Sequence, residues 1–284
     1  MHTISGHRRW LFGISLLVLL VIAGCSQSST PAPAAAPSAP QTAPQTAPPD
    51  TLASVHRAGA LRVCSTGDYR PFTYLDPATG QWSGIDIDLA RNMAQQLGVH
   101  LDLVHTTWGT LLADLTGGRC DAAMGGISVT ADRAAKATFS APYLVDGKAP
   151  IARCADASRF QTLAEIDQPG VRVIVNPGGT NASYAHATLK RATIVDYPDN
   201  NTIFNQLLDN HADLMLTDAS ETRWQAAQHP GQLCAVNPDH PFTTAPKAYL
   251  LSYGDTAFQQ WVDQWLKTAQ SDGTYQRISK PWTG

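Results

Sequence analysis

The chain has 284 residues, of which 15% are charged, and its formal net charge is −3. Its basic residues form no stripe, which argues against nucleic acid as a partner. The nine histidines are scattered and lack metal-ligand spacing, so we expect no metal site.

The N-terminus has the pattern of an export signal. His7-Arg8-Arg9 precede an apolar run at 10–23, and Gly24-Cys25 follows. A basic start before an apolar core of this length predicts a secretory signal over 1–24. A plain signal peptide and a membrane helix are the alternatives, although the run is short for a span. Ile22-Ala-Gly-Cys25 resembles the lipobox of bacterial lipoproteins, which implies that Cys25 is lipidated and holds the exported chain to a membrane on the periplasmic side.

A polar linker follows this signal. Residues 26–50 are almost entirely Ser, Thr, Gln, Ala and Pro, a composition that cannot bury a core. We therefore expect 25–51 to be a lipidated tether, which at about 3.1 Å per residue reaches up to roughly 75 Å from the membrane.

Strands and helices alternate in two separate runs along the remainder of the chain. In the first run, we predict strands at 61–64, 101–104 and 120–127, with helices at 86–97 and 108–115. In the second run, we predict strands at 171–175, 193–195 and 213–216, with helices at 180–190, 201–208 and 219–228. A last helix at 256–268 carries an apolar stripe that we expect to be core. Two such runs predict an α/β protein with two lobes and largely parallel sheets.

Polar segments follow four of these strands, at the sheet edge where parallel α/β folds bind ligands. They are 65–72, 128–133, 176–181 and 217–221. Arg133 offers a bidentate fork for a carboxylate. Thr180 and the amides after Gly178-Gly179 begin a helix, which suits an anion.

Each segment also has a purely structural interpretation. Thr130 fits a helix N-cap, and Asn176-Pro-Gly-Gly fits a simple turn. Asp218-Ala-Ser-Glu221 resembles a capping box, in which the glutamate bonds back to the helix start. Because all four segments fall on ligand edges, their convergence favours a binding site.

Several motifs make the sequence recognisable. Over roughly residues 52–280 the chain resembles the periplasmic solute-binding proteins for polar amino acids, family 3, through Asp68-Tyr-Arg-Pro-Phe72, Gly84-Ile-Asp-Ile-Asp88, Thr130-Ala-Asp-Arg133 and Phe139-Ser-Ala-Pro-Tyr143. Longer segments resemble the periplasmic cyclohexadienyl dehydratases, enzymes on that fold. These are Phe160-Gln-Thr-Leu163, Ile166-Asp-Gln-Pro-Gly170, Val175-Asn-Pro-Gly-Gly-Thr-Asn181, Pro198-Asp-Asn200, Asp213-Leu-Met-Leu-Thr-Asp218 and Lys247-Ala-Tyr-Leu-Leu251.

The resemblance implies a type II periplasmic-binding-protein fold with two crossovers between the lobes. Lobe 1 would comprise residues 52–147 and 246–284, and lobe 2 would comprise 148–245. Because lobe 2 would be entered and left through one hinge, Cys154 and Cys234 should lie close together, and we predict a disulfide between them. Whether Cys64 and Cys120 pair is left open, because the strand register is unknown.

The resemblance also implies decarboxylating dehydration of prephenate to phenylpyruvate, of arogenate to phenylalanine, or of both. Glu221 would be the general acid, Tyr69 and Asn176 would hold it, and Arg133 would grip a substrate carboxylate. This chemistry needs no metal or organic cofactor, but it needs a glutamic acid whose pKa is raised by desolvation in a closed cleft. We expect further substrate contacts from Asp68, Trp108, Ser128, Thr130, Lys148, Gly179, Thr180, Asn181 and Asp218.

Two other classes of protein remain open. A non-catalytic receptor would bind an amino acid or a small carboxylate and deliver it to an ABC permease. In that case Asp218 would bind the ligand's ammonium group and Glu221 would only cap its helix. A structural or adhesive lipoprotein would lack convergent polar groups in a cleft. The direction of the Glu221 side chain separates the enzyme from the receptor.

Lipidation at Cys25 predicts a simple phenotype. Cys25→Ser should release the domain from the membrane or trap the uncleaved precursor, because no thiol remains to carry the lipid. Membrane fractionation and the mass of the mature chain measure this. Unchanged fractionation together with an unchanged mass would contradict it.

Overall fold

The computed structural model describes residues 49–283. The expected signal, Cys25 and most of the expected linker lie outside these residues. Within 49–283 no helix combines the length and the apolar character that a membrane crossing requires.

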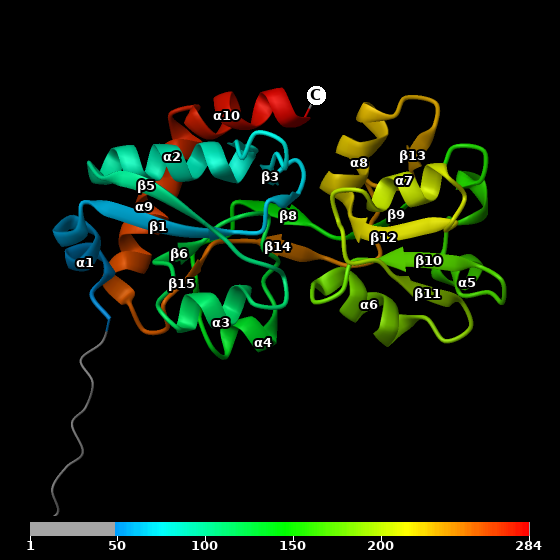
Figure 1. Cartoon of the computed structure of the whole chain (residues 1–284), viewed down its shortest axis with the longest axis horizontal. Coiled ribbons are helices and arrows are strands. Elements are labelled where there is room, and N and C mark those ends of the chain that lie inside the picture. The colour runs from blue at the N-terminus through cyan, green and yellow to red at the C-terminus, as the bar shows by residue number, and fades with distance from the viewer. Residues whose placement is uncertain (1–48, 284) are drawn as a thin grey trace, which may run out of the picture. The chain divides into compact units, whose positions relative to one another are not determined.

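The first lobe is built on a five-stranded sheet with the strand order β5-β1-β6-β15-β7 (Figure 1). Strand β1 pairs in parallel with β5 and β6, and β15 runs antiparallel between β6 and β7. The strands of this sheet are β1 (Ala60–Ser65), β5 (His100–His105), β6 (Ala122–Ala123), β7 (Thr138–Phe139) and β15 (Leu250–Leu251). A small antiparallel sheet beside it contains β2 (Asp68–Tyr69), β3 (Thr73–Leu75) and β4 (Trp82–Ser83).

Six helices accompany these strands. They are α1 (Thr51–Ala58), α2 (Ile85–Leu97), α3 (Leu111–Thr116), α4 (Ala131–Ala134), α9 (Thr256–Ser271) and α10 (Thr274–Thr283). The helix α2 ends at Gly98, whose left-handed backbone lets its N–H close the last turn. The apolar stripe of α9, including Phe258 and Val262, packs into the lobe core as expected.

The second lobe is built on a sheet with the order β11-β10-β12-β9-β13. Its strands are β9 (Lys148–Arg153), β10 (Arg172–Val175), β11 (Thr193–Asp196), β12 (Leu214–Asp218) and β13 (Leu233–Ala235). The strands β10, β11 and β12 are parallel, whereas β9 is antiparallel to both β12 and β13. Its helices are α5 (Leu163–Ile166), α6 (Thr180–Thr188), α7 (Ile203–Leu208) and α8 (Ala219–Gln228), with a 3-10 turn at Ala157–Arg159.

Two strands connect the lobes. β8 (Leu144–Asp146) leads out of the first sheet, β14 (Ala245–Lys247) leads back to it, and the two pair antiparallel as a two-stranded hinge (Figure 1). The α/β class with two lobes and two crossovers is therefore confirmed. We retain 52–147 plus 246–284, and 148–245, as the proposed division between lobes.

Some elements differ from the sequence-based predictions. The strand predicted at 120–127 is only the short β6, because Gly125 and Gly126 adopt positive φ angles of 146° and 65°. A Cβ at Gly126 would lie 2.5 Å from the Phe72 ring, so this turn requires glycine. The prediction also missed β9, a continuous buried run rather than an alternating one, since strands covered on both faces lose the polar–apolar alternation.

The predicted disulfide between Cys154 and Cys234 is present, with the Cα atoms 4.8 Å apart. Cys154 directly follows β9 and Cys234 lies in β13, and the two strands are neighbours in the sheet. The bond closes a loop with a sequence separation of 80.

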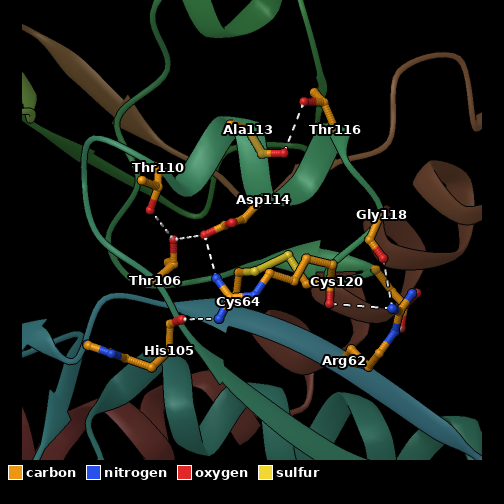
Figure 2. The surroundings of a disulfide bond; sticks show 12 residues. Arg62, Cys64, His105, Thr106, Thr110, Ala113, Asp114, Thr116, Gly118 and Cys120 are labelled. Atoms are coloured by element: carbon orange, nitrogen blue, oxygen red, sulfur yellow. Dashed lines mark hydrogen bonds and ion pairs between the residues drawn. A yellow bond between two sulfur atoms is a disulfide. The ribbon is translucent and has the colours of Figure 1, made fainter.

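A second disulfide joins Cys64 of β1 to Cys120, which lies two residues before β6, with the Cα atoms 5.6 Å apart. Both cysteines are buried in an apolar cluster with α3. Figure 2 shows Arg62 beside them, donating from its guanidinium to the Gly118 carbonyl at 2.8 Å. The bond therefore ties together two strands that lead into polar segments of the site.

Loss of the second-lobe disulfide should destabilise the fold. The chain-entropy model assigns about 4 kcal/mol to a loop of this length, and removal of native disulfides typically costs about 2–5 kcal/mol. The double variant Cys154→Ser/Cys234→Ser should show this loss in guanidinium unfolding. An unfolding curve that coincides with that of the parent protein would contradict the prediction.

Candidate functional site

The predicted polar segments meet between the two sheets. They enclose a cavity of about 20 Å³, which is room for about one water molecule. Asn176 follows β10 and Asp218 ends β12, so the carboxyl ends of parallel strands supply the lobe-2 wall. The lining residues are Tyr69, Trp108, Gly126, Ser128, Arg133, Asn176, Gly179, Thr180, Asn181, Asn200 and Asp218.

Most of the expected site residues line this cavity, but four do not. Asp68, Thr130, Lys148 and Glu221 lie behind or beside it. Gly126 and Asn200 line the cavity although the sequence analysis did not single them out as ligand contacts. Asn200 belongs to the Pro198-Asp-Asn200 motif, so the resemblance was the signal that could have found it.

Asp218 is the centre of a buried charge cluster. Its Oδ1 accepts from Lys148 Nζ at 2.7 Å, and its Oδ2 accepts from Lys247 Nζ and from the Tyr69 hydroxyl. The side chains of Asp218, Lys148 and Lys247 are 3%, 4% and 0% exposed. Burial alone would raise the pKa of Asp218, but the two lysines outweigh burial and hold this pKa well below its usual range. Asp218 is therefore an ionised anchor and not an acid.

Lys247 is the residue of this cluster that the sequence analysis missed. It comes from the hinge strand β14 and also donates to Ser128 Oγ at 2.9 Å and to the Tyr69 hydroxyl at 3.3 Å. Its only signal was a lysine heading the apolar run Lys247-Ala-Tyr-Leu-Leu251. Lysines are rarely fully buried unless they are paired, so a lysine in such a run could have been flagged.

Lys148 connects Asp218 to the start of α6. Its Nζ donates to Thr180 Oγ1 at 2.9 Å and to Asn181 Oδ1. Burial lowers the pKa of Lys148, Asp218 opposes this, and the nearby Lys247 charge adds to the lowering. Thr180 and Asn181 are thus held by side-chain bonds at the helix start.

Glu221 lies in the first turn of α8 and is 1% exposed. Its Oε2 accepts from the Thr217 hydroxyl at 2.5 Å, and Asn181 Nδ2 in turn donates to Thr217 Oγ1 at 2.9 Å. Asp218 is the N-cap of α8, but its side chain makes no capping hydrogen bond. The capping-box interpretation of this segment is therefore wrong.

The environment of Glu221 favours its protonated form. Burial raises its pKa to about 8, and the charges of Asp218 and Asp68 act in the same direction. The Thr217 hydrogen bond and the Lys148 charge lower the pKa and only partly compensate. Glu221 is thus a carboxylic acid near neutral pH, as its expected role requires.

The expected supports of Glu221 have other partners in the structure. The Tyr69 hydroxyl donates to Asp218, and Asn176 Nδ2 donates to the carbonyls of Tyr197 at 3.2 Å and Pro198 at 2.9 Å. Neither Tyr69 nor Asn176 bonds to Glu221, so that expectation is corrected. Thr217 comes from the strand end next to α8, where its hydroxyl is four residues from the glutamate, and it takes the place of both.

Arg133 faces the cavity from α4. Its Nη1 donates to the Ser128 carbonyl at 2.9 Å, the one acceptor that this side chain has among residues 49–283. Its guanidinium carbon lies 5.9 Å from the centre of the Trp108 ring. Thr130 accepts from the Arg133 amide at 3.3 Å as the N-cap of α4, so the structural interpretation of Thr130 holds.

Asp68 is the hydrogen-bond partner of the Trp108 indole. Its Oδ1 accepts from Trp108 Nε1 at 3.1 Å, and its carbonyl accepts from Asn200 Nδ2 at 2.8 Å. Burial raises the pKa of Asp68 to about 6, against the hydrogen bond from Trp108. The Asn200 bond joins lobe 2 to lobe 1 across the cleft.

Comparison with known proteins gives this site its context. Residues 61–284 match the model of the bacterial extracellular solute-binding proteins, family 3. The chain belongs to this family. Cyclohexadienyl dehydratase of Pseudomonas aeruginosa is 50% identical over 231 residues, which are 81% of this chain and 85% of that protein. The L-cystine-binding protein TcyJ of Escherichia coli (strain K12) is 24% identical over 233 residues, 82% of this chain and 86% of that protein.

Solved structures of similar proteins show the same fold. An ancestral amino acid-binding protein, a precursor of cyclohexadienyl dehydratase, has a TM-score of 0.77 and 32% identity, covering 83% of this chain and 100% of that one. An ancestral cyclohexadienyl dehydratase has a TM-score of 0.52 and 44% identity, covering 84% and 98%. The resemblance stated from the sequence is therefore confirmed, and membership in an extracellular family agrees with the expected export.

Burial of Glu221 predicts a particular dependence of stability on pH. The folded pKa of about 8 lies above the ordinary value of 4.5, so the contribution of the buried acid is fully present below 4.5 and is lost as the pH rises through 8. Relative to Glu221→Gln, which has no titrating group there, the parent should lose about 3–5 kcal/mol of unfolding free energy across this range. Urea unfolding of both proteins at several pH values measures the difference. Parallel stability curves would contradict the assignment.

Proposed function

We propose that the chain is a cyclohexadienyl dehydratase that converts prephenate to phenylpyruvate, arogenate to phenylalanine, or both. The observation that carries this proposal is Glu221, a fully buried carboxyl whose pKa of about 8 keeps it protonated near neutral pH. It lies beside a cluster of buried cations suited to a substrate with two carboxylates. The 50% identity to a cyclohexadienyl dehydratase supports the same activity.

The proposed reaction is a single acid-assisted elimination. Glu221 gives its proton to the ring hydroxyl, which leaves as water. The bond between the ring and its carboxylate breaks, CO₂ departs, and the released electron pair completes the aromatic ring. Glu221 is left ionised and regains a proton from solvent. For prephenate the balance is one dianion and one proton giving phenylpyruvate, CO₂ and water.

The binding groups have separate roles in this proposal. Arg133 offers a guanidinium fork to one carboxylate, and Lys148 and Lys247 supply more positive charge than Asp218 neutralises. Thr180, Asn181 and Gly179 border the substrate from lobe 2, and Trp108 with Ser128 borders it from lobe 1. Tyr69 and Asn176 act at a distance from the acid, since Tyr69 fixes Asp218 and Asn176 fixes the 197–198 backbone.

The size of the cavity requires a conformational step. A volume of about 20 Å³ does not hold a cyclohexadienyl ring, so the lobes must separate about the β8–β14 hinge to admit substrate. We infer that Glu221 then turns from Thr217 toward the bound ring. Closure around the substrate would keep water away from the acid and preserve its raised pKa.

The receptor interpretation fits this geometry less well. It requires an Asp218 carboxylate free for an ammonium group and a Glu221 that caps α8. In the structure both oxygens of Asp218 already accept from protein donors, and Glu221 makes no capping bond. An ABC permease would be a partner only under that interpretation.

We also propose anchoring of the domain on the periplasmic side of a membrane through Cys25. Membership in an extracellular family supports export, and the lipobox-like Ile22-Ala-Gly-Cys25 supports the lipid. Residues 26–50 would then act as the tether.

Substitution of Glu221 tests the proposed acid. Glu221→Gln should lower kcat at least about 10²–10⁴-fold, because the amide cannot act as a general acid. Affinity for carboxylate ligands should change little, since the charge cluster is untouched. Arg133→Ala should instead weaken binding as well as turnover. Phenylpyruvate formation from prephenate gives kcat and KM for each variant.

The chain offers a matched control for this substitution. It contains two glutamates, and the second, Glu165, is exposed in the capping box of α5 in the same lobe. Glu165→Gln retains the capping geometry and should leave kcat unchanged. Parent-like turnover by Glu221→Gln would overturn the mechanism. A parent protein that binds an amino acid and forms no phenylpyruvate would replace the enzyme with the receptor.

A further inference from the structure

We propose that the site selects the 2-oxo acid prephenate over the 2-amino acid arogenate, because the one carboxylate on the cavity wall is already occupied by two lysines and a tyrosine. The inference rests on the proposed function and deepens it. The two substrates differ at one position, where prephenate has a neutral ketone and arogenate has an ammonium group with three N–H donors.

An ammonium group in this cavity meets no free anionic acceptor. Within residues 49–283, Asp218 is the one carboxylate that lines the cavity. Lys148 bonds to its Oδ1, while Lys247 and Tyr69 bond to its Oδ2. All three donors belong to the protein. The side chains of Lys148 and Lys247 are 4% and 0% exposed, and Tyr69 is 3% exposed. A substrate ammonium would have to displace one of these buried donors.

The charge of the site acts in the same direction. Lys148 and Lys247 both pair with the carboxylate of Asp218, and the buried Asp86 and Asp146 act on these lysines through charge without bonding to them. Arg133 is the third cation of the wall, and among the described residues it bonds to a backbone carbonyl and to no carboxylate. A buried guanidinium without a bonded counter-ion is unfavourable until an anion arrives. A substrate with two carboxylates and no cation supplies that anion best. The ammonium of arogenate adds a like charge to the cluster, and such juxtaposition discriminates against a ligand.

Two other acceptors lie near the cavity, and neither reverses this preference. Asn200 is 4% exposed, and its Oδ1 is buried without a hydrogen-bond partner among the described residues. That oxygen is uncharged and can accept from the ring hydroxyl, which both substrates carry, so it does not require an ammonium. Asp68 lines a neighbouring cavity of about 700 Å³, and Trp108, which borders both cavities, bonds to its Oδ1.

The first test compares the two substrates on the parent protein. We expect kcat/KM for prephenate to exceed that for arogenate by about 10- to 100-fold, the range expected when one buried polar group is left without a hydrogen-bond partner. Equal values, or a higher value for arogenate, would overturn the inference while leaving the dehydratase function intact.

Variants at Lys148 then separate charge from shape. Lys148→Met frees Asp218 Oδ1 and removes one cation, so the preference for prephenate should fall at least about tenfold. Lys148→Arg keeps the cation and should retain the parent ratio. Lys136→Met, on the exposed surface of lobe 1, is the matched control and should also retain it. A ratio that is the same in Lys148→Met as in the parent would contradict the proposed origin of the selectivity.

A binding measurement distinguishes failure of this inference from failure of the proposed function. Titration calorimetry with phenylpyruvate and L-phenylalanine, an unreactive 2-oxo and 2-amino pair, reports the same preference without turnover. If neither substrate reacts but phenylpyruvate binds at least about tenfold more tightly, the dehydratase function fails and the selectivity stands. Tighter binding of L-phenylalanine would overturn the selectivity, whatever the activity and whether or not the variants fold.

Discussion

The closed arrangement of the two lobes depends on the interactions of Asp218. This carboxylate ends β12 in lobe 2, while Lys247 comes from the hinge and Tyr69 from the lobe-1 edge. None of the three charged side chains in the cluster is more than 4% exposed. Removing one partner from such a cluster leaves an uncompensated buried charge, which is far more costly than losing a surface ion pair. The cluster therefore specifies one closed geometry, in which the cavity walls are built from both lobes.

The same cluster sets the chemistry of its neighbour Glu221. Because Asp218 stays ionised, its negative charge adds to the effect of burial and disfavours a second carboxylate three residues away. Asp218 is therefore ionised while Glu221, one helical turn later, is protonated. A site that donates a proton and also holds an ionic anchor requires this difference. The distinction arises from partners: Asp218 has two lysines, and Glu221 has a threonine hydroxyl.

The sequence predicted the larger features well because each rests on local patterns or on long matching segments. Two β-α-β runs gave two lobes, and the shared hinge brought Cys154 and Cys234 together. The errors lie where a side chain chooses between partners that are distant in the sequence. Tyr69 lies 149 residues from Asp218, and Lys247 lies 119 residues from Ser128. No periodicity encodes such pairs, so Lys247 was missed and Tyr69 was assigned to the wrong carboxyl group.

The two disulfides have a consequence for how the protein combines resistance to unfolding with movement of its lobes. Each bond lies within one sheet region, Cys64 with Cys120 in the first and Cys154 with Cys234 in the second, and neither crosses the hinge. Covalent cross-links therefore oppose unfolding of each lobe without opposing the separation of the lobes. Resistance to denaturation and the exchange of ligands are governed by different bonds, so selection can strengthen one without slowing the other.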